Sequence, residues 1–247
     1  MISTPSRLRM LLAAGAIALT ALAPWPAQAA THSWPPPRVG ALFRYWQFDD
    51  HNDLHDYITY WATGPVFVQF EYWDFTNPDA PDQFRPEVHY TFRDGRASTY
   101  DIGWRHEYQR ERLMFGTEQL VGGRWVARAG VSPIIWSDSV KTVLSAGADY
   151  YFGSYSFASA TVIRDPRSGG LWVFPMRVRI ADEQNNWVQG TVSPTTDRSI
   201  GWAFDAKWRW MLLGVERNSR YDFTNVDNMI YTLGVELPFP VRAHDSP

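Results

Sequence analysis

The sequence contains no cysteine, so the fold must be stable without disulfides. It has no run of 18 or more apolar residues, which excludes a transmembrane helix. Basic clusters are also lacking: the 23 Lys and Arg residues, against 26 Asp and Glu, are scattered among acidic and aromatic residues. Nucleic-acid-binding proteins normally show a basic stripe, so we expect no nucleic-acid partner. No cofactor motif is present, and we expect no cofactor.

The first 29 residues have the pattern of a secretory signal peptide. Arg7 and Arg9 precede an apolar run, Met10 to Ala23, which is too short to span a bilayer, and Ala27 and Ala29 supply a small-x-small cleavage site. Cleavage would leave 21 basic and 26 acidic residues, a net charge of −5. We therefore predict an exported protein with four segments: a signal peptide (1–29), a proline-rich leader (30–38), one barrel domain (39–239) and a short polar tail (240–247).

Aromatic residues, in contrast, are abundant: they make up 16% of the chain, with 13 tryptophans. Tryptophan and tyrosine collect where apolar and wet surroundings meet, either at lipid headgroups or on surfaces that stack sugars. The clusters "RYWQF" (44–48), "EYWDF" (71–75) and "KWRWM" (207–211) mix such rings with charges and suit both settings. We favour the membrane girdle over the sugar site.

The segment "DNMIYTLGVELPF" (227–239) alternates strictly between larger apolar residues and mostly polar or small ones. A period of two indicates a strand with one apolar face. The same alternation, separated by turn-forming residues, recurs along the chain. Segment 108–121 could also be written as an amphipathic helix, but Gly116 and Thr117 in its middle favour a strand. The predicted strands are 39–48, 54–62, 66–75, the short "VHYTF" (88–92), 100–108, 108–121, 125–131, 139–152, 172–180, 199–208, 211–217 and 227–239.

These strands, about twelve give or take two, predict an all-β, up-and-down antiparallel transmembrane β-barrel. A soluble sandwich would alternate in the same way, but three features favour the membrane: strands of about ten residues, aromatics near strand ends, and a second face of small and charged residues. On the barrel hypothesis, that second face lines the lumen, and opposite charges there can pair. The lumen-lining candidates are Asp101, Arg105, Glu107, Arg128, Lys141, Asp149, Arg177, Arg179, Asp205, Lys207, Glu216 and Glu236.

The carboxyl-terminal part also resembles known proteins. "YTLGVELPF" is similar to the terminal strand of outer-membrane barrels, which their assembly machinery recognises. In this chain eight residues follow Phe239. "VSPIIWSDSVKTVLSAGADYYFG", "LGVERNSRYDF" and "VDNMIYTLGVELPF" resemble the barrel of the YaiO-type outer-membrane proteins over about half of the mature chain. The resemblance implies a fold and a location in the outer membrane, and no defined activity.

Two constellations could carry chemistry. The loop "FDDHNDLHD" (48–56) offers weak metal-ligand candidates, Asp49, His51, Asp53 and His55, but it lacks the EF-hand spacing and a complete zinc set, which favours a solvated turn. A surface hydrolase would need a histidine, a serine and a carboxylate within hydrogen-bond reach. The histidines to consider are His89 and His106, with Ser98 and Ser199 as imaginable partners.

The leading hypothesis is a non-enzymatic outer-membrane barrel for passage or surface handling of a hydrophilic substance, for which the aromatic richness suggests a polysaccharide. Its expected partners are outer-membrane lipid, the barrel assembly machinery and a saccharide. The alternatives are a soluble periplasmic β-sandwich or lipocalin-like module that binds a carbohydrate or small ligand, and a barrel-embedded lipid hydrolase.

Overall fold

In the part of the chain that the structure describes, the regular elements are β-strands. The computed structural model describes residues 37–49, 52–94, 98–166, 170–184, 186–218 and 228–238. The predicted signal peptide, most of the leader and the polar tail lie outside these residues. Within them, no helix is long and apolar enough to cross a membrane. The strands are β1 (Arg38–Phe48), β2 (Leu54–Thr63), β3 (Val66–Phe75), β4 (Gln83–Arg93), β5 (Ser98–Glu107), β6 (Arg110–Leu120), β7 (Trp125–Trp136), β8 (Val140–Tyr151), β9 (Phe157–Asp165), β10 (Leu171–Val173), β11 (Met176–Ala181), β12 (Trp187–Pro194), β13 (Ile200–Trp208), β14 (Met211–Asn218) and β15 (Asn228–Pro238).

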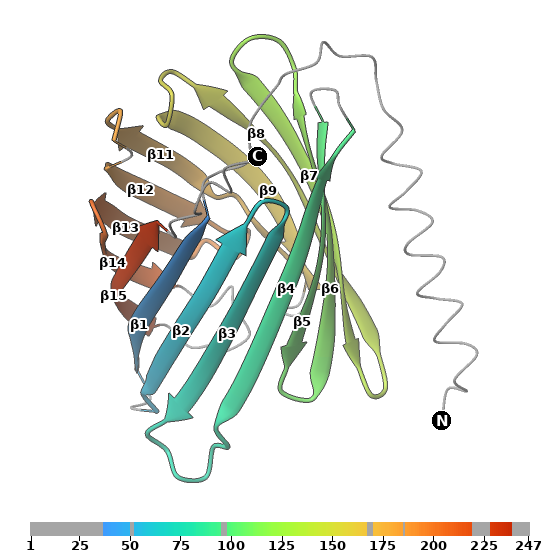
Figure 1. Ribbon diagram of the computed structural model, residues 1–247. Helices are drawn as coiled ribbons and strands as arrows, with labels where there is room; N and C mark the ends of the chain where they lie inside the picture. Colours follow the sequence, from blue (N-terminus) through green and yellow to red (C-terminus); the bar gives the residue numbers. More distant parts are fainter. Residues whose placement is uncertain are drawn as a thin grey trace, which may run out of the picture.

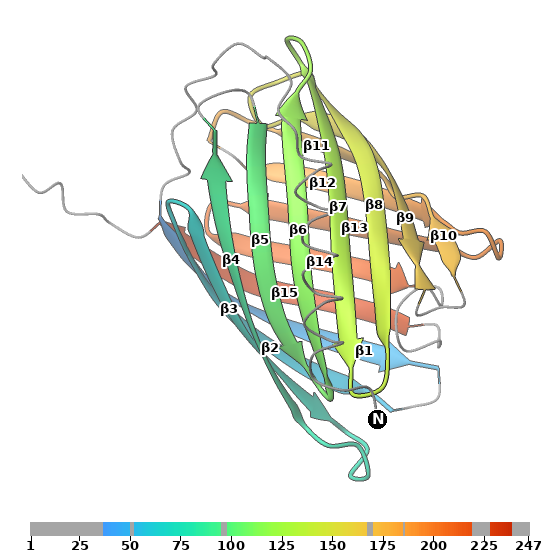
Figure 2. The same ribbon diagram turned by 90° about the vertical axis from the view of Figure 1, so that its right-hand side faces the viewer.

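These strands form one closed antiparallel sheet, visible as a barrel in Figures 1 and 2. Each strand pairs with the next along the chain, and β1 pairs with β15 over its full length. Strands β10 and β11 both pair with β9, at opposite ends of it, so they occupy one position. The interruption falls at Pro175, which has no backbone N–H to donate to a ladder. The barrel therefore has 14 strand positions in up-and-down order, within the predicted range.

The strand prediction for 108–121 is confirmed by β6, and no helix occupies this segment. Two strands were missed, β9 and β12, and they account for the difference between twelve predicted positions and fourteen. In both strands the alternation has little contrast, because small residues such as Ala158, Ala160 and Gly190 stand on the apolar face. Their sequences therefore resemble loops more than strands.

The apolar face of the strands points away from the barrel axis. On β15, Leu233 and Leu237 are 58% and 48% exposed, and on β11 Ile180 is 59% exposed. Similar exposed residues stand at alternate positions of β2, β4, β5, β12 and β13. The sheet closes on itself rather than packing face to face with a second sheet, so the β-sandwich alternative is wrong.

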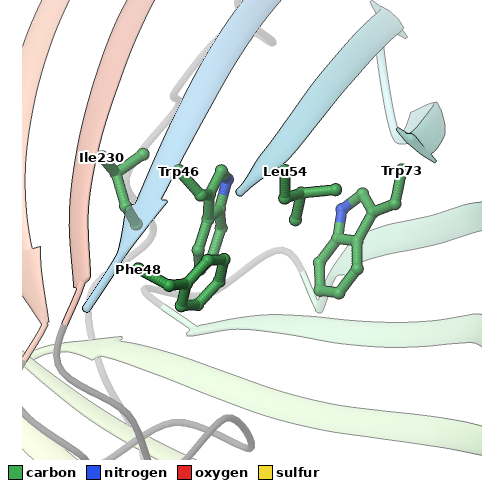
Figure 3. Close-up of a cluster of buried hydrophobic side chains, with 5 residues drawn as sticks. All are labelled: Trp46, Phe48, Leu54, Trp73 and Ile230. Atoms are coloured by element: carbon green, nitrogen blue, oxygen red, sulfur yellow. The ribbon is translucent and has the colours of Figure 1, made fainter. Parts of the chain in front are cut away.

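A smaller apolar cluster lies inside the barrel. Trp46, Phe48, Leu54, Trp73 and Ile230 are all buried and pack together where β1 and β3 end and β2 and β15 begin (Figure 3). We call this end the distal rim, and the opposite end, which holds Arg38 and Pro238, the proximal rim. The cluster explains why the aromatics of the first strands occupy both faces: some rings face outward, and others fill the distal interior.

The β1–β15 seam, which joins the two ends of the described chain, gives a test of closure. A Cβ atom at Gly234 would lie 2.2 Å from Leu42 and 2.8 Å from the Ala41 carbonyl oxygen, whereas nothing lies within 4 Å of one at Gly190. Closed barrels run anomalously on gels until they are heated. We expect Gly234→Ala to lower the temperature of this shift and Gly190→Ala to leave it unchanged or raise it. Equal behaviour of the two variants would argue against the closed seam.

Candidate functional site

The functional candidates lie on the inner face of the barrel. Strand alternation places the twelve predicted residues opposite the exposed apolar side chains, and most of them contact other inward residues. The structure brings together Arg105 with Glu107, Arg128 with Asp149, and Lys207 with Glu236. The remaining residues lie on the same face: Asp101, Lys141, Arg177, Arg179, Asp205 and Glu216.

The densest arrangement is an ion-pair network on the wall formed by β1 to β6, centred on Glu71. This carboxylate is 1% exposed. Arg44 Nη2 lies 2.8 Å from its Oε1, Arg85 Nη1 lies 3.7 Å from its Oε2, and Arg105 bonds to the same Oε2. Trp73 Nε1 also donates to Oε1 at 2.8 Å. One carboxylate thus joins strands β1, β3, β4 and β5 across the inner face.

The network extends from this centre in both directions. Arg44 also holds the buried Asp56 at 2.6 Å. Toward β6, Glu107 receives Arg85 at 3.3 Å and Arg110 at a shorter distance, while Arg105 also reaches the nearby Glu87 at 3.0 Å. The guanidinium of Arg85 lies 3.8 Å above the ring of Trp73. Charges buried in this way are tolerated because each has opposite charges beside it.

Most residues of this network were not predicted from the sequence. The prediction named Arg105 and Glu107 but none of Arg44, Asp56, Glu71 or Arg85. One signal was available: β4, "QFRPEVHYTFR", alternates along its whole length, with Arg85, Glu87 and His89 on one face. The predicted strand there was too short to include Arg85 and Glu87.

His89 is the most constrained histidine of the inner face. Its Nδ1 lies 2.7 Å from Asp101 Oδ2, and its Nε2 lies 2.6 Å from Glu87 Oε1. Asp101 and Glu87 can both accept a hydrogen bond from the ring only when both ring nitrogens carry hydrogen. Neither nitrogen is then available as a base toward a serine. His106 points outward and pairs with Glu111 at 2.7 Å. These contacts give no support to the hydrolase alternative.

The predicted metal-ligand candidates are engaged elsewhere. Asp53 accepts the hydroxyl of Tyr45 and the backbone N–H of Phe48. The ring of His55 stacks on Phe43, with centroids 6.0 Å apart. Asp49 is exposed in the turn, and His51 lies outside the described residues. Among the residues that the structure describes, no group of three or more His, Cys, Asp or Glu side chains could hold a metal ion.

Beside the ion-pair network, along the wall formed by β4 to β10, the interior contains open space. Two cavities of about 400 and 370 Å³ share Asp101, Gly116, Gly130 and Ser145, and together we call them the inner groove. Gly116 is paired in register with Gly130, which is paired with Ser145, so this part of the wall carries almost no side chain. Toward the proximal rim the groove is lined by Thr99, Glu118, Arg128 and Thr161, and toward the distal rim by Arg112, Ser132 and Asp165.

The wall beyond the groove carries cations without acidic partners. Arg177 and Arg179 point inward from β11, and among the described residues no carboxylate oxygen lies within 4.0 Å of their nitrogens. Arg179 Nε donates to Gln189 at 3.0 Å. The inner face thus has an ion-paired wall, a groove lined by small and hydroxyl-bearing residues, and a wall with two unpaired arginines.

Comparison with known proteins finds solved structures with a similar fold. No protein-family model matches the sequence, and a search of curated proteins finds no match. The barrel is similar to the Acinetobacter baumannii outer membrane protein Omp33, with a TM-score of 0.54, 10% identity, and coverage of 84% of this chain and 99% of that chain. It is also similar to the KdgM porin, solved in complex with disordered oligogalacturonate, with a TM-score of 0.50, 9% identity, and coverage of 81% and 99%. At these identities the likeness is one of fold alone: a closed, up-and-down antiparallel β-barrel.

The centre of the ion-pair network gives a second prediction. Glu71→Gln keeps the size of the side chain but removes the charge that three arginines share. We expect a loss of about 3–5 kcal/mol in the free energy of unfolding, measured by urea titration of the folded barrel. The matched control is Glu111→Gln at the half-exposed outer pair with His106, where about 1 kcal/mol or less should be lost. Similar losses for the two variants would contradict the central role of Glu71.

Proposed function

We propose that the protein is an outer-membrane β-barrel that passes hydrophilic solutes along the inner groove. The single observation that carries this proposal is the sorting of side chains by the closed sheet. Large apolar residues cover the outside, whereas charged, hydroxyl-bearing and glycine residues line the inside. In water, an apolar exterior with a polar interior would be unfavourable, whereas a barrel in lipid requires it.

The outer surface supports the membrane location. Exposed Leu, Ile, Val, Phe, Trp and Tyr residues recur around the barrel, far beyond the scattered apolar residues of a soluble surface. Tyr57 and Tyr72 stand outward near the distal rim, and Trp61 and Trp208 outward near the proximal rim. They form the two aromatic girdles of this proposal, at the level of the lipid headgroups. The closed sheet also leaves no strand edge to be solvated in lipid.

The inner groove supports passage. Its lining of Thr, Ser, Asp, Glu and Arg side chains can replace the water around a polar solute. Several described connectors are short, with two-residue turns at 108–109 and 209–210, and the groove is lined by residues of the strands. Small residues at Gly116 and Gly130 keep that space open.

A saccharide is the cargo that we favour. The neighbouring KdgM porin was solved with an oligogalacturonate, and the inner face here combines aromatic rings with hydrogen-bonding groups. The likeness of the carboxyl-terminal half to YaiO-type barrels and the signal-peptide pattern are in keeping with export to the outer membrane by the barrel assembly machinery. We propose no enzymatic activity.

The membrane location predicts a dependence on depth along β15. Leu233 lies at the middle of the strand and Leu237 near its proximal end, both on the outer face. Arginine costs about 2–4 kcal/mol at the bilayer midplane and about 0–1 near its surface. Leu233→Arg should therefore lower the unfolding free energy in vesicles by that larger amount and Leu237→Arg by the smaller one. On a water-exposed surface both changes would have equally little effect.

Passage through the groove predicts a blocking substitution. A Cβ atom at Gly116 would have only ordinary contacts, the nearest at 3.7 Å, so a side chain can be added there and would extend into the groove. We expect Gly116→Phe to lower single-channel conductance in planar bilayers at least severalfold. Gly190→Phe, which adds the same side chain to the outer face, should not change it. Unchanged conductance in a folded Gly116→Phe protein would reject the groove as the path.

A further inference from the structure

The inner arginines differ sharply in their surroundings. On the β1–β6 wall, Arg44, Arg85, Arg105 and Arg110 each have a carboxylate within salt-bridge distance. Arg177 and Arg179, on the opposite part of the barrel, have none among the described residues. The Nε of Arg177 is buried and without a hydrogen-bond partner, as is that of Arg105, so the contrast between the two walls lies in the carboxylates. Guanidinium groups in a partly buried setting need acceptors, so this pair is suited to receive them from a ligand.

Arg179 is held in place by aromatic rings rather than by charge. Its guanidinium carbon lies 4.2 Å from the ring centroid of Trp187 and 5.2 Å from that of Phe157, and its Nε donates to Gln189 at 3.0 Å. Stacking of this kind fixes the plane of the guanidinium and leaves its terminal N–H groups available. Such a fork matches the two oxygens of a carboxylate.

Around the arginines lie groups that bind hydroxyls. Arg177 is paired in register with Ser159 of β9 and Thr191 of β12. Ser159 in turn accepts a hydrogen bond from Arg128, a residue of the inner groove, at 3.1 Å. The arginine pair thus adjoins the proposed path of the solute, on its proximal side.

One acid lies close enough to oppose an anion. Asp205 accepts Nε2 of Gln189 at 3.3 Å but forms no ion pair with either arginine. Glu236 is the other acid that interacts electrostatically with Arg179. It forms a salt bridge with Lys207 and accepts a hydrogen bond from the Tyr60 hydroxyl. Asp205 therefore weakens the attraction of an external carboxylate without cancelling two cations.

We infer that Arg177 and Arg179, with Gln189, Ser159 and Thr191, form a subsite on the inner wall for an acidic saccharide, whose carboxylate binds the arginines and whose hydroxyls bind the neighbouring polar groups. This inference rests on the proposed function and adds to it a substrate class. It also separates two roles of arginine in one lumen: the paired arginines hold the wall, and the unpaired ones bind cargo.

The test is calorimetric titration of the full barrel in detergent with hexagalacturonate, and with maltohexaose as the neutral control. We expect the acidic hexamer to bind more tightly than the neutral one, and the double variant Arg177→Gln, Arg179→Gln to weaken its binding about tenfold or more. Asp205→Asn should strengthen it. Lys141→Gln, which removes an inner-face cation near the distal rim, should change it by less than about twofold, because the salt-screened field of one distant charge is weak.

Several results would overturn the subsite: no preference for the acidic hexamer, unchanged binding in the double variant, or an equal loss in Lys141→Gln. Single-channel recording of the same proteins separates this outcome from failure of the proposed function. A wild-type barrel that conducts ions but shows none of the arginine effects keeps the channel and loses the subsite. A barrel that binds the acidic hexamer through the arginines but conducts nothing keeps the subsite and loses the channel.

Discussion

The structure depends on the closure of the sheet between β1 and β15. Pairing of Arg38 through Phe48 with Pro238 through Asn228 removes the two free edges that an open sheet of this size would have. Once the sheet is closed, its two faces meet different surroundings, and each residue's parity along a strand decides which surroundings it meets. The apolar exterior and the polar interior are both consequences of this one constraint.

Within the closed wall, the interior is divided by the way charge is neutralised. Glu71 binds three arginines and a tryptophan, and the apolar cluster around Trp46 lies beside it, at the distal end of β1, β2, β3 and β15. This half is consolidated by the protein's own groups. Along β6 and β7, next to that half, the pairing of Gly116 with Gly130 removes side chains from the wall. On β11, no carboxylate among the described residues forms a salt bridge with Arg177 or Arg179. One part of the inner wall is thus held together by ion pairs within the protein, and the other has groups that can bind a solute. This difference is the basis for the proposed solute path and saccharide subsite.

How far the sequence predicts this arrangement depends on contrast and on range. Strands such as β8, β13 and β15, with large apolar residues opposite small or charged ones, are evident from the sequence, and the orientation of their side chains follows directly. Strands β9 and β12 are not, because alanine and glycine on the outer face weaken the alternation. The Glu71 network could not be predicted: its partners Arg44 and Arg105 are 27 and 34 residues away in sequence, and the register of four strands decides whether they meet. The unpaired state of Arg177 and Arg179 is likewise visible only when all neighbours are placed.

The positions of the two arginines and of the distal cluster also give the barrel a direction. The two arginines without a salt bridge among the described residues lie in the proximal half of the wall, while the rings of Trp46, Phe48 and Trp73 lie inside the distal end. A solute that enters at the proximal rim therefore meets charges and side chains in a different order from one that enters at the distal rim. On the proposed function, ionic current through the barrel should therefore rectify, with a magnitude that depends on the sign of the applied voltage.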